Sequence, residues 1–123
     1  MSKYLKLLIL PDLKSAVFLT VVFTLAICAG TLTALPEKID VPGTDKWQHL
    51  VAFAALVYPI TVASRRYWIP VTVFASCLAA LIEIIQPYVN RFGDIKDFQA
   101  DMLGVFLGLL IGILVRRLRV KRN

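Results

Sequence analysis

The one histidine and a few acidic residues are the side chains of this sequence best suited to chemistry. His49 lies four residues after Asp45, and Asp97 and Asp101 repeat that spacing. Residues four apart share one face of a helix and lie about one turn apart along its axis. Glu83 precedes a proline by four residues, and a proline disfavours helix at the residue before it. We therefore expect His49, Glu83 and Asp101 to lie at one depth, each about one turn from a helix end.

These residue types suit several kinds of site. Imidazole and carboxyl groups act as general acids and bases, so His49, Glu83 and Asp101 are the catalytic candidates. The same three residues with Asp97 form a conceivable divalent metal site. The sequence has no compact motif such as H-E-x-x-H, however, so we expect no metal and no other cofactor. An ion-pair network that only stabilises the fold is the third interpretation.

The composition indicates a membrane protein. The 123 residues are 59% apolar and 18% charged, with a mean hydropathy of +0.75. A soluble domain is nearer half apolar and a quarter charged. A soluble core of this size could not bury the excess, which argues against a cytosolic enzyme, a disordered tail or a secreted disulfide scaffold. We expect one domain over residues 1–123.

Four uncharged runs predict four membrane helices in an all-α, polytopic bundle. A bilayer core about 30 Å thick takes roughly 20 helical residues to cross. The third helix must then carry Glu83, and the fourth Asp101, below the membrane surface. The expected helices cover approximately residues 15–35, 46–64, 67–86 and 97–116.

The basic residues predict an orientation. The N-terminal segment, the link between the second and third helices and the C-terminal tail carry a net charge of +9, and the other two links carry −3. Cytoplasmic segments of membrane proteins are enriched in Lys and Arg. We therefore expect both termini in the cytoplasm and the acidic links outside. The basic tail would attract anionic lipid, and we expect no nucleic-acid partner.

Three glycines predict the packing face of the fourth helix. Gly104, Gly108 and Gly112 recur every four residues and share an arc of roughly 80° with Asp97 and Asp101. Small residues at this spacing let membrane helices approach closely. The two carboxyl groups should therefore face the bundle, and self-association of the chain through this helix is a further expectation.

Buried carboxylates need partners. An ionised carboxylate in hydrocarbon costs roughly 2.5–3.5 kcal/mol on insertion scales, so Glu83 and Asp101 must be paired, protonated or hydrated. The available cations are a protonated His49, Lys46 and Arg91. The planar guanidinium of Arg91 suits bidentate binding of a carboxylate or a phosphate.

An ordered series of motifs extends from Asp45 to Gly108. It consists of Asp45-Lys46-x-x-His49-x-x-x-Phe53, Glu83-x-x-Gln86, and Arg91 followed by Asp97, Asp101, Gly104 and Gly108. With this series the sequence resembles the VanZ-like family of small bacterial membrane proteins, and the last stretch is similar to the family pattern R-x(5)-D-x(3)-N-x(2)-G-x(3)-G. The chain has Asp101 where the family usually has Asn, which removes an NH₂ donor and adds an acceptor.

The resemblance implies a bacterial inner-membrane protein of the cell envelope, in a family associated with resistance to the glycopeptide teicoplanin. We expect an outer-leaflet polar pocket that binds a membrane lipid, a lipid-linked envelope precursor or a lipoglycopeptide. An enzyme that hydrolyses or transfers a lipid headgroup is one alternative, and an assembly or scaffold protein is another. The expected ligand-binding residues are Asp45, Lys46, His49, Glu83, Gln86, Arg91, Asp94, Asp97 and Asp101. Lys46 and Arg91 would meet an anion, His49, Glu83 and Asp101 would handle its protons or hydroxyls, and Gln86, Asp94 and Asp97 would orient them.

Overall fold

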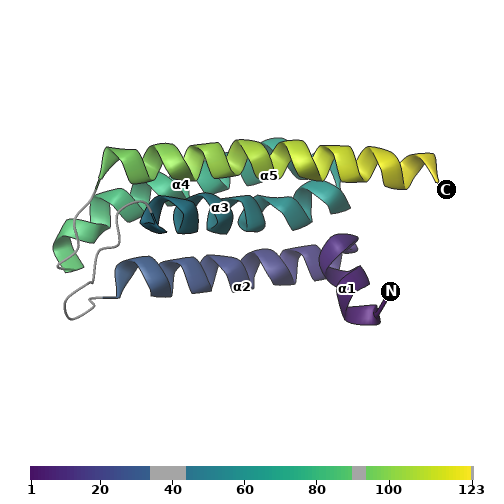
Figure 1. The fold of residues 1–123 in the computed structure, drawn as a ribbon, viewed down its shortest axis with the longest axis horizontal. Helices are drawn as coiled ribbons and strands as arrows, with labels where there is room; N and C mark the ends of the chain where they lie inside the picture. The colour runs from purple at the N-terminus through teal and green to yellow at the C-terminus, as the bar shows by residue number, and fades with distance from the viewer. Residues whose placement is uncertain (34–43, 90–93, 123) are drawn as a thin grey trace.

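The computed structural model describes residues 1–33, 44–89 and 94–122, and every regular element in these ranges is helical. The all-α expectation is therefore confirmed. Four long helices run side by side, and a short N-terminal helix lies at one end of them (Figure 1). The elements are α1 (Lys3–Ile9), α2 (Leu13–Leu32), α3 (Thr44–Ala63), η1 (Arg65–Tyr67), α4 (Trp68–Ile85), η2 (Gln86–Val89) and α5 (Ile95–Lys121).

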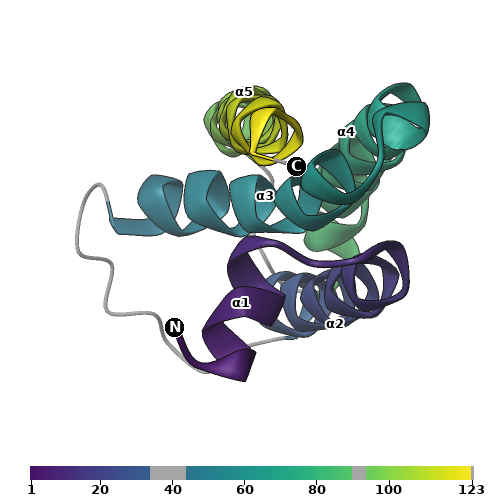
Figure 2. The same cartoon turned by 90° about the vertical axis from the view of Figure 1, so that its right-hand side faces the viewer.

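Helix α3, which corresponds to the second expected span, is at the centre of the bundle. It lies between α5 and α2 in both perpendicular views (Figures 1 and 2) and packs most extensively against α5. Phe53, Leu56, Val57 and Val62 of α3 are each no more than 1% exposed. A helix that buries apolar residues on several sides is surrounded by protein, so α3 positions its neighbours as well as its own polar start.

The glycine stripe of α5 faces α3. A Cβ atom at Gly108 would lie 2.5 Å from the carbonyl oxygen of Ala54 and 2.6 Å from Cγ2 of Val57. A Cβ atom at Gly104 would likewise overlap the Leu50 carbonyl group, and one at Gly112 would lie 2.8 Å from Cβ of Thr61. Only glycine allows this approach. Because α3 of the same chain covers the stripe, self-association through α5 would need another face of that helix.

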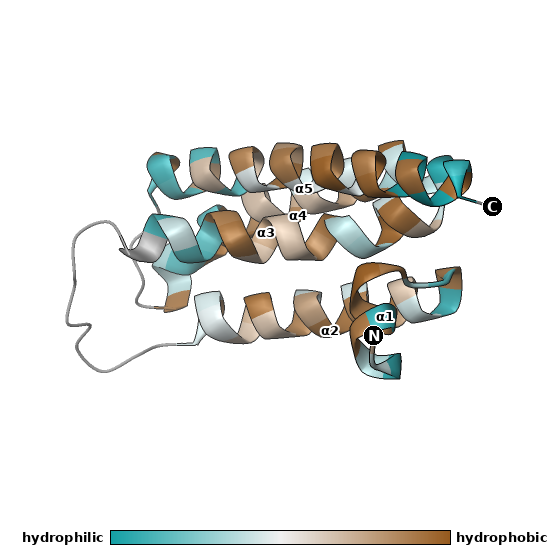
Figure 3. Ribbon diagram, turned by 45° about the vertical axis from the view of Figure 1, so that its right-hand side comes forward, coloured by the Kyte–Doolittle hydropathy of each residue, from teal (hydrophilic) through white to brown (hydrophobic). Residues whose placement is uncertain are grey.

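In the described part of the chain, three helical stretches are long and apolar enough to cross a membrane: Leu13–Leu32, Arg65–Val89 and Ile95–Lys121. The sequence predicts a fourth span over residues 46–64; α3 is long enough at 20 residues, but it is not apolar enough to qualify. Its first turns are polar, with Asp45, Lys46 and His49. Figure 3 shows hydrophobic residues along the middle of the bundle and hydrophilic ones towards its ends.

The helix boundaries follow local signals in the sequence. Asp94 begins α5 by accepting the Lys96 backbone N–H on its Oδ1 at 2.9 Å, so the helix starts two residues before the expected position. The expected end near Pro87 is observed, because α4 stops at Ile85 and continues as the 3₁₀ helix η2. The N-terminal helix α1 was not expected.

The two termini lie at the same end of the bundle (Figure 1). At that end Nη1 of Arg116 donates to the carbonyl oxygens of Val62 at 3.0 Å and Ala63 at 2.9 Å. These carbonyls belong to the last turn of α3, which has no helical N–H donors beyond it. Asp12 precedes α2 at this end, and a hydrogen bond from the Ser15 hydroxyl lowers the pKa of its carboxyl group.

Candidate functional site

A histidine and an aspartate from two different helices form the centre of the candidate site. Nδ1 of His49, in the second turn of α3, lies 2.8 Å from Oδ1 of Asp101 on α5. His49 is 6% exposed and Asp101 is fully buried. A carboxylate that accepts from one imidazole nitrogen fixes the orientation and the tautomer of the ring.

The second aspartate of α5 lies on the other side of the same ring. Oδ2 of Asp97 is 4.0 Å from Nε2 of His49, and Asp97 is 7% exposed. The buried positions of α5 are Asp97, Asp101, Gly104, Val105, Gly108 and Gly112. The four-residue spacing that places the glycines against α3 therefore also turns both carboxyl groups towards His49.

Glu83 brings α4 to the site. Its Oε2 accepts the backbone N–H of Asp94 at 2.8 Å, which connects the last turn of α4 to the start of α5. Its Oε1 is buried and has no hydrogen-bond partner among the described residues. One ligand atom each from His49, Glu83 and Asp101 lie within 4.8 Å of one another. Within residues 1–33, 44–89 and 94–122, these three side chains form the group that could hold a metal ion.

Gln86 points in part towards α2. It is 2% exposed, and its Nε2 donates to the carbonyl oxygen of Thr31 at 3.3 Å. The amide oxygen Oε1 is buried without a partner in the described part of the chain. Thr31 is a site neighbour that the sequence did not indicate, because its contribution is a backbone carbonyl.

The other expected site residues lie further out or outside the description. Lys46 and Asp94 are exposed, and Asp94 acts through its backbone N–H on Glu83 and its side chain on α5. Asp45 is in the first turn of α3, but its side chain is outside the described residues. Arg91 also lies outside them.

The polar cluster is rich in acceptors. His49, Glu83, Asp97 and Asp101 bring together three carboxyl groups and one imidazole from α3, α4 and α5. Ionised carboxyl groups only accept hydrogen bonds. The arrangement therefore suits a ligand that supplies hydroxyl or ammonium donors or a metal cation, or a reaction in which His49 exchanges a proton.

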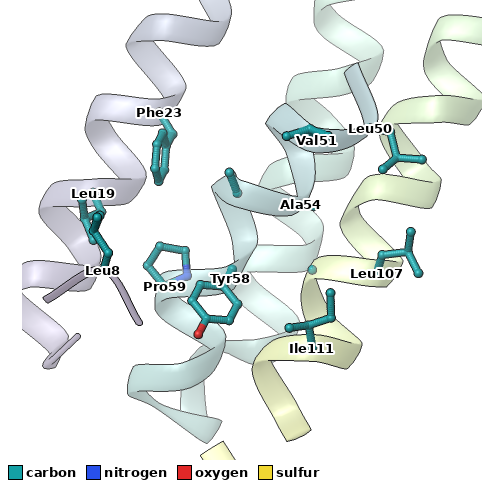
Figure 4. Close-up of a pocket in the computed structure, with 12 residues that line it drawn as sticks. Leu8, Leu19, Phe23, Leu50, Val51, Ala54, Tyr58, Pro59, Leu107 and Ile111 are labelled. Atoms are coloured by element: carbon teal, nitrogen blue, oxygen red, sulfur yellow. The ribbon is translucent and has the colours of Figure 1, made fainter. Parts of the chain in front are cut away.

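A separate apolar cavity of about 400 Å³ lies beside α3. Leu19 and Phe23 of α2 stand on one side of it and Ile111 of α5 on the other, with Tyr58 of α3 between them (Figure 4). Tyr58 lies nine residues after His49, so it projects about 180° away around α3. The cavity and the polar cluster thus occupy opposite sides of α3, and no sequence signal indicated the cavity.

The family model described as VanZ/LLP1 matches residues 7–116. The chain belongs to this family. The match confirms the resemblance of this VanZ-like protein to the family. The motifs indicated it over residues 45–108, and the match extends it to α2 and most of α5. No curated protein and no solved structure matches the chain. With its three apolar helices, this VanZ-like chain is a membrane protein.

Proposed function

We propose that this VanZ-like protein binds the polar head of a lipid-linked or amphiphilic envelope ligand at the cluster of His49, Glu83, Asp97 and Asp101. The observation that carries the proposal is the convergence of His49, Glu83 and Asp101 from three helices to within 4.8 Å. Ionisable groups at membrane depth are costly and mark ligand or ion sites in membrane proteins. A purely structural network would not need the buried Oε1 of Glu83, which has no hydrogen-bond partner among the residues that the structure describes.

The proposed setting is the bacterial cytoplasmic membrane, with α2, α3, α4 and α5 crossing it and both termini in the cytoplasm. The positive-inside rule supports this orientation, because Lys and Arg dominate the end that carries the termini. Packing on α2, α4 and α5 shields α3 from acyl chains, so that helix can cross despite its polar start. The cluster then lies one to two turns below the outer surface.

The proposed ligand has a hydroxylated or phosphorylated head and an apolar tail. Its hydroxyls would donate to Glu83 and Asp101, while Lys46 and Arg91 would meet an anionic group nearer the surface. Leu81 and Ile84 flank Glu83 on α4 and are 51% and 64% exposed. These side chains offer an apolar surface along which the tail would lie. Lipid-linked envelope precursors and lipoglycopeptides such as teicoplanin both have this chemistry.

Binding is tested by a labelled, glycosylated polyprenyl phosphate, whose sugar hydroxyls can donate to Glu83, and by the lipids that purify with the chain. Glu83→Gln keeps the shape of the side chain but removes its charge, and a hydrogen bond to a charged group contributes about 1.5–3 kcal/mol. We expect roughly tenfold weaker binding or more. The control is Asp12→Asn, which removes an exposed carboxylate at the opposite end. Equal binding by both folded variants and the natural chain contradicts the proposal.

Headgroup hydrolysis or transfer is the second candidate function. The 2.8 Å contact between His49 and Asp101 favours it, because an imidazole oriented by a carboxylate suits general-base catalysis. Labelled envelope lipids incubated with the purified protein should then yield product, and His49→Gln should abolish turnover. An absence of product over many hours, while lipid still binds, would leave binding as the function.

A further inference from the structure

The acidic character of the cluster raises a problem for a phosphorylated ligand. Glu83, Asp97 and Asp101 oppose an approaching phosphate, and of the described side chains in the cluster only His49 can carry a positive charge. Lys46 is exposed on the surface one turn away. In a medium of low dielectric constant, repulsion between like charges is much stronger than in water. A cation between the carboxylates and the ligand would remove this repulsion.

We propose that His49, Glu83 and Asp101 form a binding site for one divalent metal ion. This inference rests on the proposed function, because it names the ion through which the same cluster would bind an anionic headgroup. Imidazole with carboxylates is a donor set that suits Zn²⁺ or Mn²⁺ better than Ca²⁺ or Mg²⁺, which prefer oxygen ligands only.

The geometry of the three residues fits such an ion. Metal–ligand bonds of about 2.0–2.2 Å place two ligand atoms on one ion no more than about 4.4 Å apart. The ligand atoms here lie within 4.8 Å of one another, so side-chain rotations that shorten the widest separation would bring all three onto one ion. An ion shared by His49 and Asp101 would replace the hydrogen that now lies between Nδ1 and Oδ1.

Two buried oxygens supply an observation independent of the cluster's composition. Oε1 of Glu83 and Oε1 of Gln86 have no hydrogen-bond partner among the described residues, and Gln86 is 2% exposed. A buried acceptor without a partner destabilises the folded state. Glu83 is itself one of the three ligands, so a metal ion satisfies its free oxygen directly.

The surroundings of the cluster supply the outer contacts that metal sites use. Asp97 lies 4.0 Å from Nε2 of His49, and the Asp94 backbone N–H holds Oε2 of Glu83 at 2.8 Å. Outer partners of this kind orient metal ligands, and their loss typically weakens metal binding 10–100-fold. Asp97 and Asp94 would thus position His49 and Glu83 without binding the ion.

The test is Mn²⁺ binding by the tag-free, chelator-treated chain in lipid nanodiscs, measured by electron paramagnetic resonance with Zn²⁺ as competitor. We expect one Mn²⁺ per chain, displaced by Zn²⁺ and bound at least tenfold more weakly by Glu83→Gln. Asp12→Asn should bind like the natural chain. A failure to saturate, or equal weakening by both substitutions, would overturn the inference.

A second readout needs no variant. The chain has one histidine, so the imidazole resonances of a ¹⁵N-histidine sample report on His49 specifically. One equivalent of Mn²⁺ should broaden them beyond detection, and unchanged resonances would overturn the inference.

The inference and the proposed function fail in different ways. Polyprenyl phosphate that binds equally well in excess chelator refutes the metal site but leaves headgroup binding in place. Saturable Mn²⁺ binding without lipid binding refutes the proposal that the cluster binds a lipid headgroup but leaves the metal site in place.

Discussion

Nδ1 of His49 and Oδ1 of Asp101 lie 2.8 Å apart in the interior of the bundle, although 52 positions separate the two residues in the chain. The contact joins the start of α3 to the first turns of α5. It buries an imidazole and a carboxyl group together, since the two side chains are 6% and 0% exposed.

Replacement of Asp101 should distinguish its charge from its hydrogen bond. Asp101→Leu leaves His49 without this acceptor, and the loss of one member of a buried ionisable pair typically costs about 3–5 kcal/mol. Asp101→Asn keeps an acceptor oxygen, so we expect a loss of only about 1 kcal/mol. Unfolding of the purified protein in detergent measures both values. Equal destabilisation by the two substitutions would contradict a role for the hydrogen bond.

The contact between α3 and α5 should not tolerate an added methyl group. Gly108→Ala would place a Cβ 2.5 Å from the Ala54 carbonyl oxygen, and we expect a loss of about 1–3 kcal/mol from overpacking. The matched control is Gly30→Ala in α2, where a Cβ has nothing within 4 Å. That variant should be neutral or up to about 1 kcal/mol more stable. Thermal unfolding measures the stability of both variants. Similar melting temperatures for Gly108→Ala and Gly30→Ala would argue against close packing of α5 on α3.

Arg116 should stabilise the end of α3 beyond its contribution to topology. Arg116→Met removes two hydrogen bonds to the Val62 and Ala63 carbonyls, which we expect to cost about 1.5–3 kcal/mol. Arg117→Met removes the same charge from an exposed neighbour and should change stability by less than about 0.5 kcal/mol. The comparison uses unfolding free energies of both proteins. Were Arg117→Met equally harmful, charge rather than capping would explain the effect.

The orientation of the bundle can be measured by cysteine labelling. In a chain with Cys28 and Cys77 replaced by alanine, a membrane-impermeant maleimide should label Tyr88→Cys in intact cells. It should label Lys121→Cys only after the cells are permeabilised. Tyr88 is 86% exposed at the end of the bundle that holds the cluster, so access does not limit the first reaction. The reverse pattern would move the polar cluster to the cytoplasmic side.

Much of the helical structure could be predicted from the sequence, because the signals are local. Apolar runs and charge patterns indicated helices and membrane spans, and the proline at position 87 indicated the end of α4. The spacing of Asp97, Asp101 and the glycines assigned them to one face of α5, since the pitch of a helix relates neighbours four residues apart. Those five positions are buried in the structure, together with Val105.

The central position of α3 did not follow from local signals. Its apolar second half resembles that of a fourth membrane span, yet its polar start keeps its mean hydropathy below that of the three candidate spans. Only its contacts with α2, α4 and α5 show that protein surrounds it. The short helix α1 was missed, although its start has a local signal in Ser2, whose hydroxyl oxygen accepts the Leu5 backbone N–H at 3.2 Å. Its end also makes a tertiary contact, in which the Tyr58 hydroxyl donates to the Ile9 carbonyl oxygen at 2.8 Å.

The sequence by itself determined that this is a helical membrane protein of the VanZ/LLP1 family, with most of its acidic residues near one end and most of its basic residues near the other. It did so because hydropathy, charge and helical spacing are properties of neighbouring residues. Only the tertiary structure decided that Asp101 contacts His49, that Glu83 binds the Asp94 backbone and that Gln86 reaches Thr31. These contacts join residues from different helices. Several residues of similar chemistry could form such pairs, and the packing of whole helices, rather than a local sequence pattern, decides which of them meet.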